Sequence, residues 1–142
     1  MKTEQIKMGQ EIATEHGLVL GKKLTSVMEC IEAKPGAIPR AMTPPRASIP
    51  NVLIYKVMDK MFAILSIRGA VGVILKCEAE RVHFLREQYE GIGHRSHLDS
   101  RFWISVKIDA DIPMNKIKDL VQHSYEQVCS KLTRKQKEEL LG

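Results

Sequence analysis

Branched and aromatic residues gather in three short runs in the middle of the chain, a composition typical of β-strands. The runs cover Asn51–Met58, Met61–Ile67 and Gly72–Cys77. Only Asp59-Lys60 separates the first two runs, and Arg68–Val71 separates the next two. Neither link has room for the crossover that parallel neighbours require. The pattern therefore predicts an antiparallel meander of three strands.

A fourth run, Arg101–Ile108, alternates between apolar and polar residues, as a strand does when only one of its faces is buried. One predicted face carries Phe102, Ile104, Val106 and Ile108. The other carries Arg101, Trp103, Ser105 and Lys107. If a helix covers this second face, Trp103 packs inside the protein; if the face is open, Trp103 lies among cations on the surface.

Apolar residues at helical spacing predict helices on both sides of these strands. The first covers residues 24–31 and ends at Pro35-Gly36, because proline cannot continue the hydrogen-bond ladder. The second covers residues 78–90, after the meander. A long third helix begins after Pro113 and keeps its apolar stripe as far as Leu132. Residues 133–141 then begin with a capping-box pair, Thr133 and Gln136, which predicts a last short helix.

Strands clustered together with helices at the ends indicate an α+β fold with a central antiparallel sheet of four to five strands. We expect residues 1–22 to be an N-terminal helical extension and residues 23–142 to be one domain. Residues 35–50 hold five of the six prolines, so we expect a long, extended and irregular segment there.

The cysteines, Cys30, Cys77 and Cys129, are odd in number and form no CxxC pair, which favours three reduced thiols. No apolar run approaches the ~18 residues of a membrane span, and the first residues lack the apolar core of a secretory signal. These features predict a cytoplasmic protein without a membrane partner.

The sequence offers little that resembles catalytic chemistry. His94 and His97 lie close to Asp99, but their glycine-flanked loop favours a solvated turn over a metal site. Ser124 follows His123 directly, and adjacent helical residues point too far apart to act as nucleophile and base. We expect Ser124 to pack in the core and to bond the preceding helical turn. The protein is therefore expected to be non-enzymatic, with no metal and no cofactor.

Charge is the remaining signal. There are 22 Lys and Arg residues against 17 Asp and Glu residues, and 22 − 17 gives a net charge of +5. Most of the excess comes from loops and strand faces rather than from helix surfaces. The resulting hypothesis is weak, largely sequence-tolerant DNA binding. Its candidate contacts are Arg40, Arg46, Lys56, Arg95, Arg101, Trp103 and Lys107.

An alternative hypothesis is a protein–protein interaction module that uses the sheet face or the 38–50 loop. Ile38, Met42 and Ile49 are apolar residues within that loop and could contact a partner protein. The charge excess is small enough to leave both hypotheses open.

Residues 29–141 resemble the MmcQ/YjbR family of small bacterial proteins. The resemblance rests on six segments in the family's order: ECIEAKPGA at 29–37, YKVMDKMFAILS at 55–66, ILKCEAE at 74–80, FLREQYEGI at 84–92, HLDSRFWISVKIDADIP at 97–113 and LVQHSYEQVCSKLTRKQK at 120–137. It implies an α+β fold with a central antiparallel sheet, described for the family as a double wing, and a DNA-binding role. The family pattern falls on Lys56, Phe62, Lys76, Arg86, Tyr89, His97, Arg101, Trp103, Ser124 and Tyr125.

Overall fold

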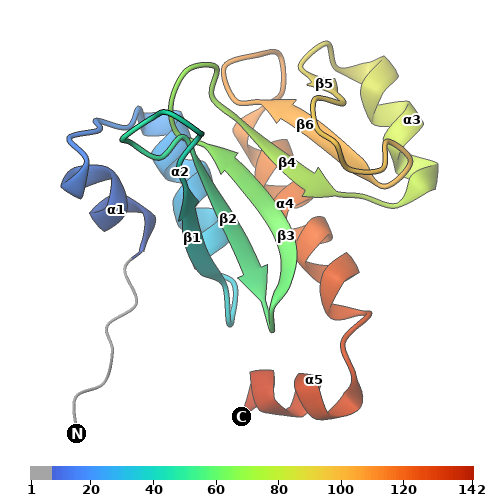
Figure 1. Ribbon diagram of the computed structural model, residues 1–142. Helices are drawn as coiled ribbons and strands as arrows, with labels where there is room; N and C mark the ends of the chain where they lie inside the picture. Colours follow the sequence, from blue (N-terminus) through green and yellow to red (C-terminus); the bar gives the residue numbers. More distant parts are fainter. Residues whose placement is uncertain (1–7) are drawn as a thin grey trace, which may run out of the picture.

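A six-stranded antiparallel sheet is the centre of the structure, a computed structural model that describes residues 8–142 (Figure 1). Its strands are β1 (Ile38–Met42), β2 (Val52–Val57), β3 (Lys60–Ser66), β4 (Gly72–Lys76), β5 (Ile92–Gly93) and β6 (Trp103–Lys107). They lie in the order β1-β2-β3-β4-β6-β5. Every neighbouring pair is antiparallel, which confirms the predicted α+β class and the meander β2–β3–β4.

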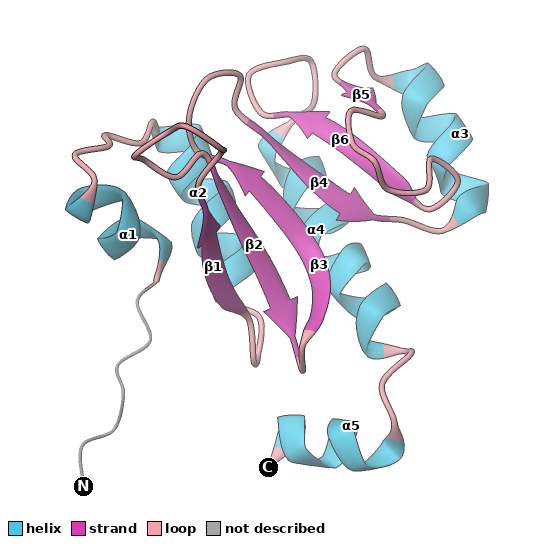
Figure 2. Ribbon diagram, viewed as in Figure 1, coloured by secondary structure: helices cyan, strands magenta, loops and turns pink. Residues whose placement is uncertain are grey.

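Five helices accompany the sheet: α1 (Gly9–Glu15), α2 (Lys22–Glu32), α3 (Ala79–Gln88), α4 (Met114–Cys129) and α5 (Arg134–Leu141). Helices α2 and α4 lie against one face of the sheet, whereas α3 lies beside the β5–β6 end (Figure 2). The predicted capping box at Thr133 and Gln136 is present at the start of α5. Within residues 8–142, none of the helices has the length and apolar character that a membrane span needs.

Two of the strands were not predicted, so the expected count of four to five was too low. Strand β1 lies in the proline-rich segment, where we expected irregular structure, and it pairs with β2 at the edge of the sheet. An edge strand uses only half of its backbone groups for pairing and therefore tolerates Pro39. Strand β5 has two residues, too few to show any alternation.

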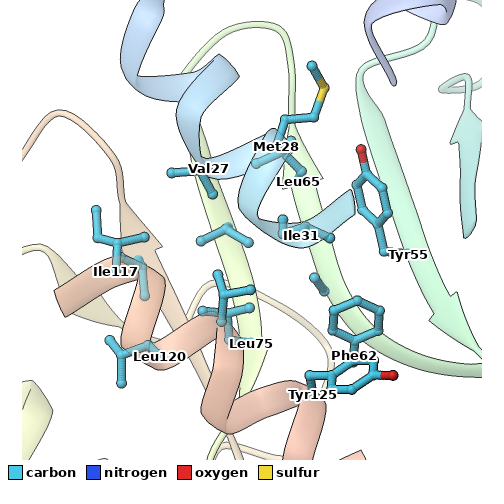
Figure 3. Packing of buried hydrophobic residues seen from close by; sticks show 14 of the residues in the cluster. Val27, Met28, Ile31, Tyr55, Phe62, Leu65, Leu75, Ile117, Leu120 and Tyr125 are labelled. Carbon is cyan, nitrogen blue, oxygen red and sulfur yellow. The ribbon is translucent and has the colours of Figure 1, made fainter. Parts of the chain in front are cut away.

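The core fills the space between the sheet and helices α2 and α4 (Figure 3). Strand residues alternate in burial, and those facing the helices are buried: Leu53, Tyr55, Val57, Leu65, Val73, Leu75, Ile104 and Val106. The helices contribute Val27, Met28, Ile31, Ile117, Leu120, Val121 and Tyr125. Most of the residues that the sequence assigns to apolar helix stripes are thus in this core.

A polar contact joins α1 to α2 and β2. Both the Gly9 N–H and the Tyr55 hydroxyl donate to Oε2 of Glu32, at 3.0 and 2.6 Å. Burial and the hydrogen bond to Glu32 raise the pKa of Tyr55. A Cβ atom at Gly9 would lie 2.5 Å from Sδ of Met28, so the close approach of α1 requires glycine. The part of the N-terminal extension that covers residues 1–7 is outside the described residues.

The hydroxyl of Ser124 bridges β3 and β4 from the helix side of the sheet. Its Oγ accepts a hydrogen bond from the Lys76 N–H at 2.8 Å and donates one to the Phe62 carbonyl at 2.6 Å. The prediction that Ser124 bonds the preceding helical turn was therefore wrong.

The bridge stands where the two strands stop pairing. Residues Ala63–Ser66 of β3 pair with Gly72–Leu75 of β4. Phe62 is an extra residue on β3, because Tyr55 pairs with Ala63 and the next residue of β2 pairs with Met61. Beyond this bulge, β3 and β4 diverge, and α4 is visible in the gap between them (Figure 1).

Replacing Ser124 by alanine should lower the free energy of unfolding by about 2 kcal/mol or more, because it leaves the part-buried Lys76 N–H and the buried Phe62 carbonyl without their partner. Urea denaturation measures the effect. Ser130→Ala is the matched control at the residue that caps the C-terminal end of α4, since Ser130 is exposed and its hydroxyl donates to the Gln127 carbonyl. It should change stability by less than about 0.5 kcal/mol. Equal effects of the two variants would contradict a bridging role for Ser124.

Candidate functional site

The sheet face opposite α2 and α4, here called the open face, is the main candidate surface. Its strand residues alternate with the buried ones and are half-buried or exposed. The side chains that the register places on it are Ile38, Arg40, Met42, Val52, Ile54, Lys56, Met61, Ile64, Ser66, Ile74, Lys76, Trp103, Ser105 and Lys107. The structure thus answers the question about Trp103: its strand face is not covered by a helix, and its side chain is half-buried.

Cations are the only charged strand residues on the open face of the described chain: Arg40, Lys56, Lys76 and Lys107. Carboxylates lie at its margin. A carboxylate oxygen of Asp59, in the turn after β2, is 3.8 Å from Nζ of Lys56, and the Asp59 side chain is almost fully exposed. An exposed pair at that distance leaves Lys56 largely available to other anions.

Three isoleucines cross the middle of the open face and form what we call the isoleucine strip. Ile54 pairs with Ile64, and Ile64 pairs with Ile74, so the three side chains follow one another on adjacent strands. Adjacent strands are about 4.8 Å apart, which gives the strip a length of about 10 Å. All three side chains are half-buried. The strip is therefore an apolar surface between flanking cations.

The gap between β3 and β4 forms a groove beside the strip, here called the lysine groove. It has a volume of about 540 Å³. Its lining residues are Lys60, Met61, Lys76, Trp103, Val128 and Lys131. Three of the six are lysines, one is the chain's single tryptophan, and none is acidic.

Arg86 of α3 holds the backbone at the start of β6. Its Nη2 donates to the carbonyl of Ser100 at 2.8 Å and to the carbonyl of Trp103 at 3.1 Å. The guanidinium thus ties α3 to the strand that presents Trp103.

A smaller cavity of about 180 Å³ lies at the other end of the open face, between β4, β6 and β5. Arg95 and Lys107 line it together with Ser66, Ser105 and Glu90. The Arg95 N–H donates to the Ser105 hydroxyl at 2.7 Å, which fixes Arg95 next to the end of β6. Of the predicted contacts, the structure therefore brings Arg40, Lys56, Arg95, Trp103 and Lys107 onto the open face or its edge.

Arg101 and Arg46 are arranged differently. Arg101 precedes β6 and forms two-pronged hydrogen bonds with Asp99, the shortest 2.7 Å, while its guanidinium lies over the Phe102 ring. Arg46 is exposed in the loop between β1 and β2, with a left-handed backbone (φ 67°). Neither belongs to the strand positions that form the open face.

The residues of the family pattern divide between the surface and the core. Lys76 is on the open face and lines the lysine groove, and His97 is exposed in the loop before β6. Tyr125 packs edge-on against Phe62 with ring centroids 5.3 Å apart, and its hydroxyl donates to the Pro35 carbonyl. Burial, reinforced by Cys129, raises the pKa of Tyr125 to about 12. Ser124 and Tyr125 therefore support the frame that positions Lys76.

His94 and His123 both form hydrogen bonds to backbone groups of the protein. His94 contacts the Leu98 carbonyl through Nε2. Nε2 of His123 accepts from the Glu78 N–H at 3.2 Å, and burial, helped by Arg81, lowers the pKa of His123. Among residues 8–142, no three His, Cys, Asp or Glu side chains are grouped so that they could hold a metal ion.

Sequence reasoning missed the isoleucine strip and the lysine groove. The strip is visible in the sequence, because Ile54 and Ile74 each lie two residues before a lysine, Lys56 and Lys76, and so share a strand face with it. The groove is not visible in the sequence, because two of its lysines are far apart in the chain. Lys60 begins β3 at a hairpin, and Lys131 follows the end of α4.

Comparisons with known proteins agree with this architecture. The YjbR family model matches residues 33–127. The uncharacterised YjbR proteins of Escherichia coli K12 and O157:H7 are each 27% identical over 119 residues, which is 83% of this chain and 97% of theirs.

Two crystal structures share the fold. A Deinococcus radiodurans protein assigned to the DUF419 domain superposes with a TM-score of 0.66 at 22% identity, covering 95% of this chain and 88% of its own. A Pseudomonas syringae protein superposes with a TM-score of 0.58 at 19% identity, covering 76% of this chain and 98% of its own.

The Asp99–Arg101 pair yields a pH prediction. Hydrogen bonds from Arg101 lower the pKa of Asp99 to about 2. Because the pKa of this carboxyl is lower in the folded protein, the ion pair contributes its full stability above the unfolded pKa, about 3.9. That contribution is lost as the pH falls through the folded pKa of about 2. NMR titration of the Asp99 carboxyl carbon should find this midpoint, and Arg101→Gln should move it up toward about 4. Arg95→Gln is the control and should leave it unchanged; a midpoint near 4 in the unaltered protein would contradict the pairing.

Proposed function

This chain belongs to the YjbR family, and we propose that it is a non-enzymatic DNA-binding protein that uses the open face of its sheet. The observation that carries the proposal is the charge of that face, whose charged strand residues are Arg40, Lys56, Lys76 and Lys107. Cations on neighbouring strands can neutralise successive phosphates, and the release of condensed counterions then favours binding.

The composition of the face supports weak and largely sequence-tolerant binding. Apart from the cations, its polar strand residues are Ser66 and Ser105, and it carries no Asn or Gln. Of arginine, asparagine and glutamine, which form paired hydrogen bonds with base edges, the face carries only Arg40. Lysine binds phosphate as a point charge without demanding a particular base.

Further features fit this role in a bacterial cytoplasm. Cys30, Cys77 and Cys129 are all free thiols, as is usual in a reducing compartment. We take the two halves of the sheet, β1–β2–β3 and β4–β6–β5, to be the two wings of the family's double-wing arrangement. The divergence of β3 and β4 at Ser124 supports that division.

A second candidate function, protein–protein interaction, is favoured by the edge strand β1. Ile38 and Met42 are 46% and 43% exposed, large values for apolar side chains. Strand β1 also has no partner on its outer side among the described strands, and an added strand of another protein could pair there. DNA binding is preferred because it accounts for the four cations of the open face as well as for the uncovered sheet.

The proposal predicts that DNA affinity falls when cations are removed from the open face. Fluorescence anisotropy would measure binding to a labelled mixed-sequence DNA, both single-stranded and duplex, at increasing salt. The double variant Lys56→Gln/Lys107→Gln should weaken binding at low salt by about tenfold or more and make the slope of log K against log salt shallower by about 1 to 2.

The matched control is Lys118→Gln/Lys135→Gln, which removes the same charge from exposed positions on α4 and α5. It should retain most of the affinity and the salt slope. Equal losses in both double variants would contradict a role for the open face. Absence of binding to either DNA at low salt would contradict DNA binding itself.

A further inference from the structure

We infer that the open face binds single-stranded rather than duplex DNA, with unpaired bases against the isoleucine strip and Trp103. The inference rests on the proposed function and specifies its substrate. It comes from apolar and aromatic surface that phosphate binding does not use.

The isoleucine strip lies where a nucleic acid held by the flanking cations must pass. Lys56 and Lys76 follow Ile54 and Ile74 by two residues on the same strands, a separation of about 7 Å. Lys107 lies on the opposite side of the strip, because it pairs with Gly72, two residues before Ile74. A chain bound across the sheet therefore has cations on both sides and half-buried isoleucines in the middle.

A duplex does not match this arrangement. Its backbones present phosphates and sugars, and the flat faces of its bases are stacked inside, so the isoleucine strip would face charged groups or trapped water. A single strand exposes the flat faces of its bases, and these faces can cover apolar side chains while the phosphates reach the cations. Because every base has such a face, contact of this kind also tolerates any sequence.

The lysine groove provides a place for one base and its phosphate. Trp103 offers an aromatic surface, and Lys60 of β3, Lys76 of β4 and Lys131 of the segment between α4 and α5 line the same groove. The residues that line this groove include no carboxylate, and Glu78 and Glu80 line the adjoining hollow, which shares Lys76, Trp103 and Lys131 with it. Aromatic rings bordered by lysines are the combination on which unpaired bases stack. The groove adjoins the strip, since Met61 and Lys76 border both.

Charge disfavours a second copy of this chain as the occupant. Two open faces in contact would bring two sets of cations together with no carboxylates on their strand positions to pair with them. The occupant must be an anion that also carries apolar surface. An acidic protein is also an anion with apolar surface, and the experiment below distinguishes it from DNA.

The test compares an oligothymidylate of about 15 nucleotides with a blunt duplex of the same length, by anisotropy at low salt. The single strand should bind about tenfold more tightly or better. Fluorescence from Trp103, the chain's single tryptophan, should be quenched by the single strand and little changed by the duplex. This second readout reports a base next to the ring and not charge alone.

Two variants test the strip directly. Ile64→Thr and Ile74→Thr keep β-branched residues in the strands, and each should weaken single-strand binding several-fold without changing duplex binding. Val19→Thr is the matched control, because Val19 is 98% exposed and lies outside the sheet. Melting curves confirm that each variant is folded at the temperature of the assay.

The outcomes separate the inference from the proposed function. Equal or tighter binding of the duplex overturns the inference and leaves DNA binding intact. Single-strand binding without quenching of Trp103, or without any effect of the isoleucine variants, overturns it as well. Failure of both DNAs to bind at low salt overturns the proposed function together with the inference and favours an acidic protein partner.

Discussion

The hydroxyl of Ser124 is the contact on which the geometry of the sheet depends. One oxygen satisfies the Lys76 N–H and the Phe62 carbonyl at the point where β3 and β4 can no longer satisfy each other. Buried backbone groups need partners, so the strands can diverge there only because α4 supplies a small donor–acceptor side chain. The divergence opens the lysine groove between Met61 and Lys76. A core contact thus shapes the surface on the other side of the sheet.

The two faces of the sheet differ in burial, and strand alternation separates them. Residues such as Leu53, Leu65 and Leu75 are fully buried against the helices and stabilise the fold. Their neighbours Ile54, Ile64 and Ile74 are apolar as well, but lie on the face that no helix covers. These three isoleucines are half-buried there, and the proposed single-strand binding would give their apolar surface a partner.

The sequence was sufficient to predict the meander, the long helix α4 and the α+β class, because alternation and helical spacing are local signals that tertiary packing reinforced here. It was not sufficient where structure depends on distant partners. Strand β1 forms in spite of Pro39 because β2 offers it an edge, and Ser124 bonds residues 48 and 62 positions away. For the candidate site, strand parity places Trp103 and Lys107 on one face of their strand and Lys56 beside Ile54 on another. The lysine groove could not be predicted, because it depends on how α4 meets the gap in the sheet.

The hydrogen bonds from Arg86 to the carbonyls of Ser100 and Trp103 have a thermodynamic consequence. They hold the backbone of β6 at its first residue before any ligand arrives. Ordering a loop or a strand end upon association reduces affinity, because conformational entropy is lost at that step. Here that loss has already occurred during folding, when α3 docked against the sheet. A ligand that stacks on the indole therefore meets a preorganised surface, and its binding should involve little induced fit.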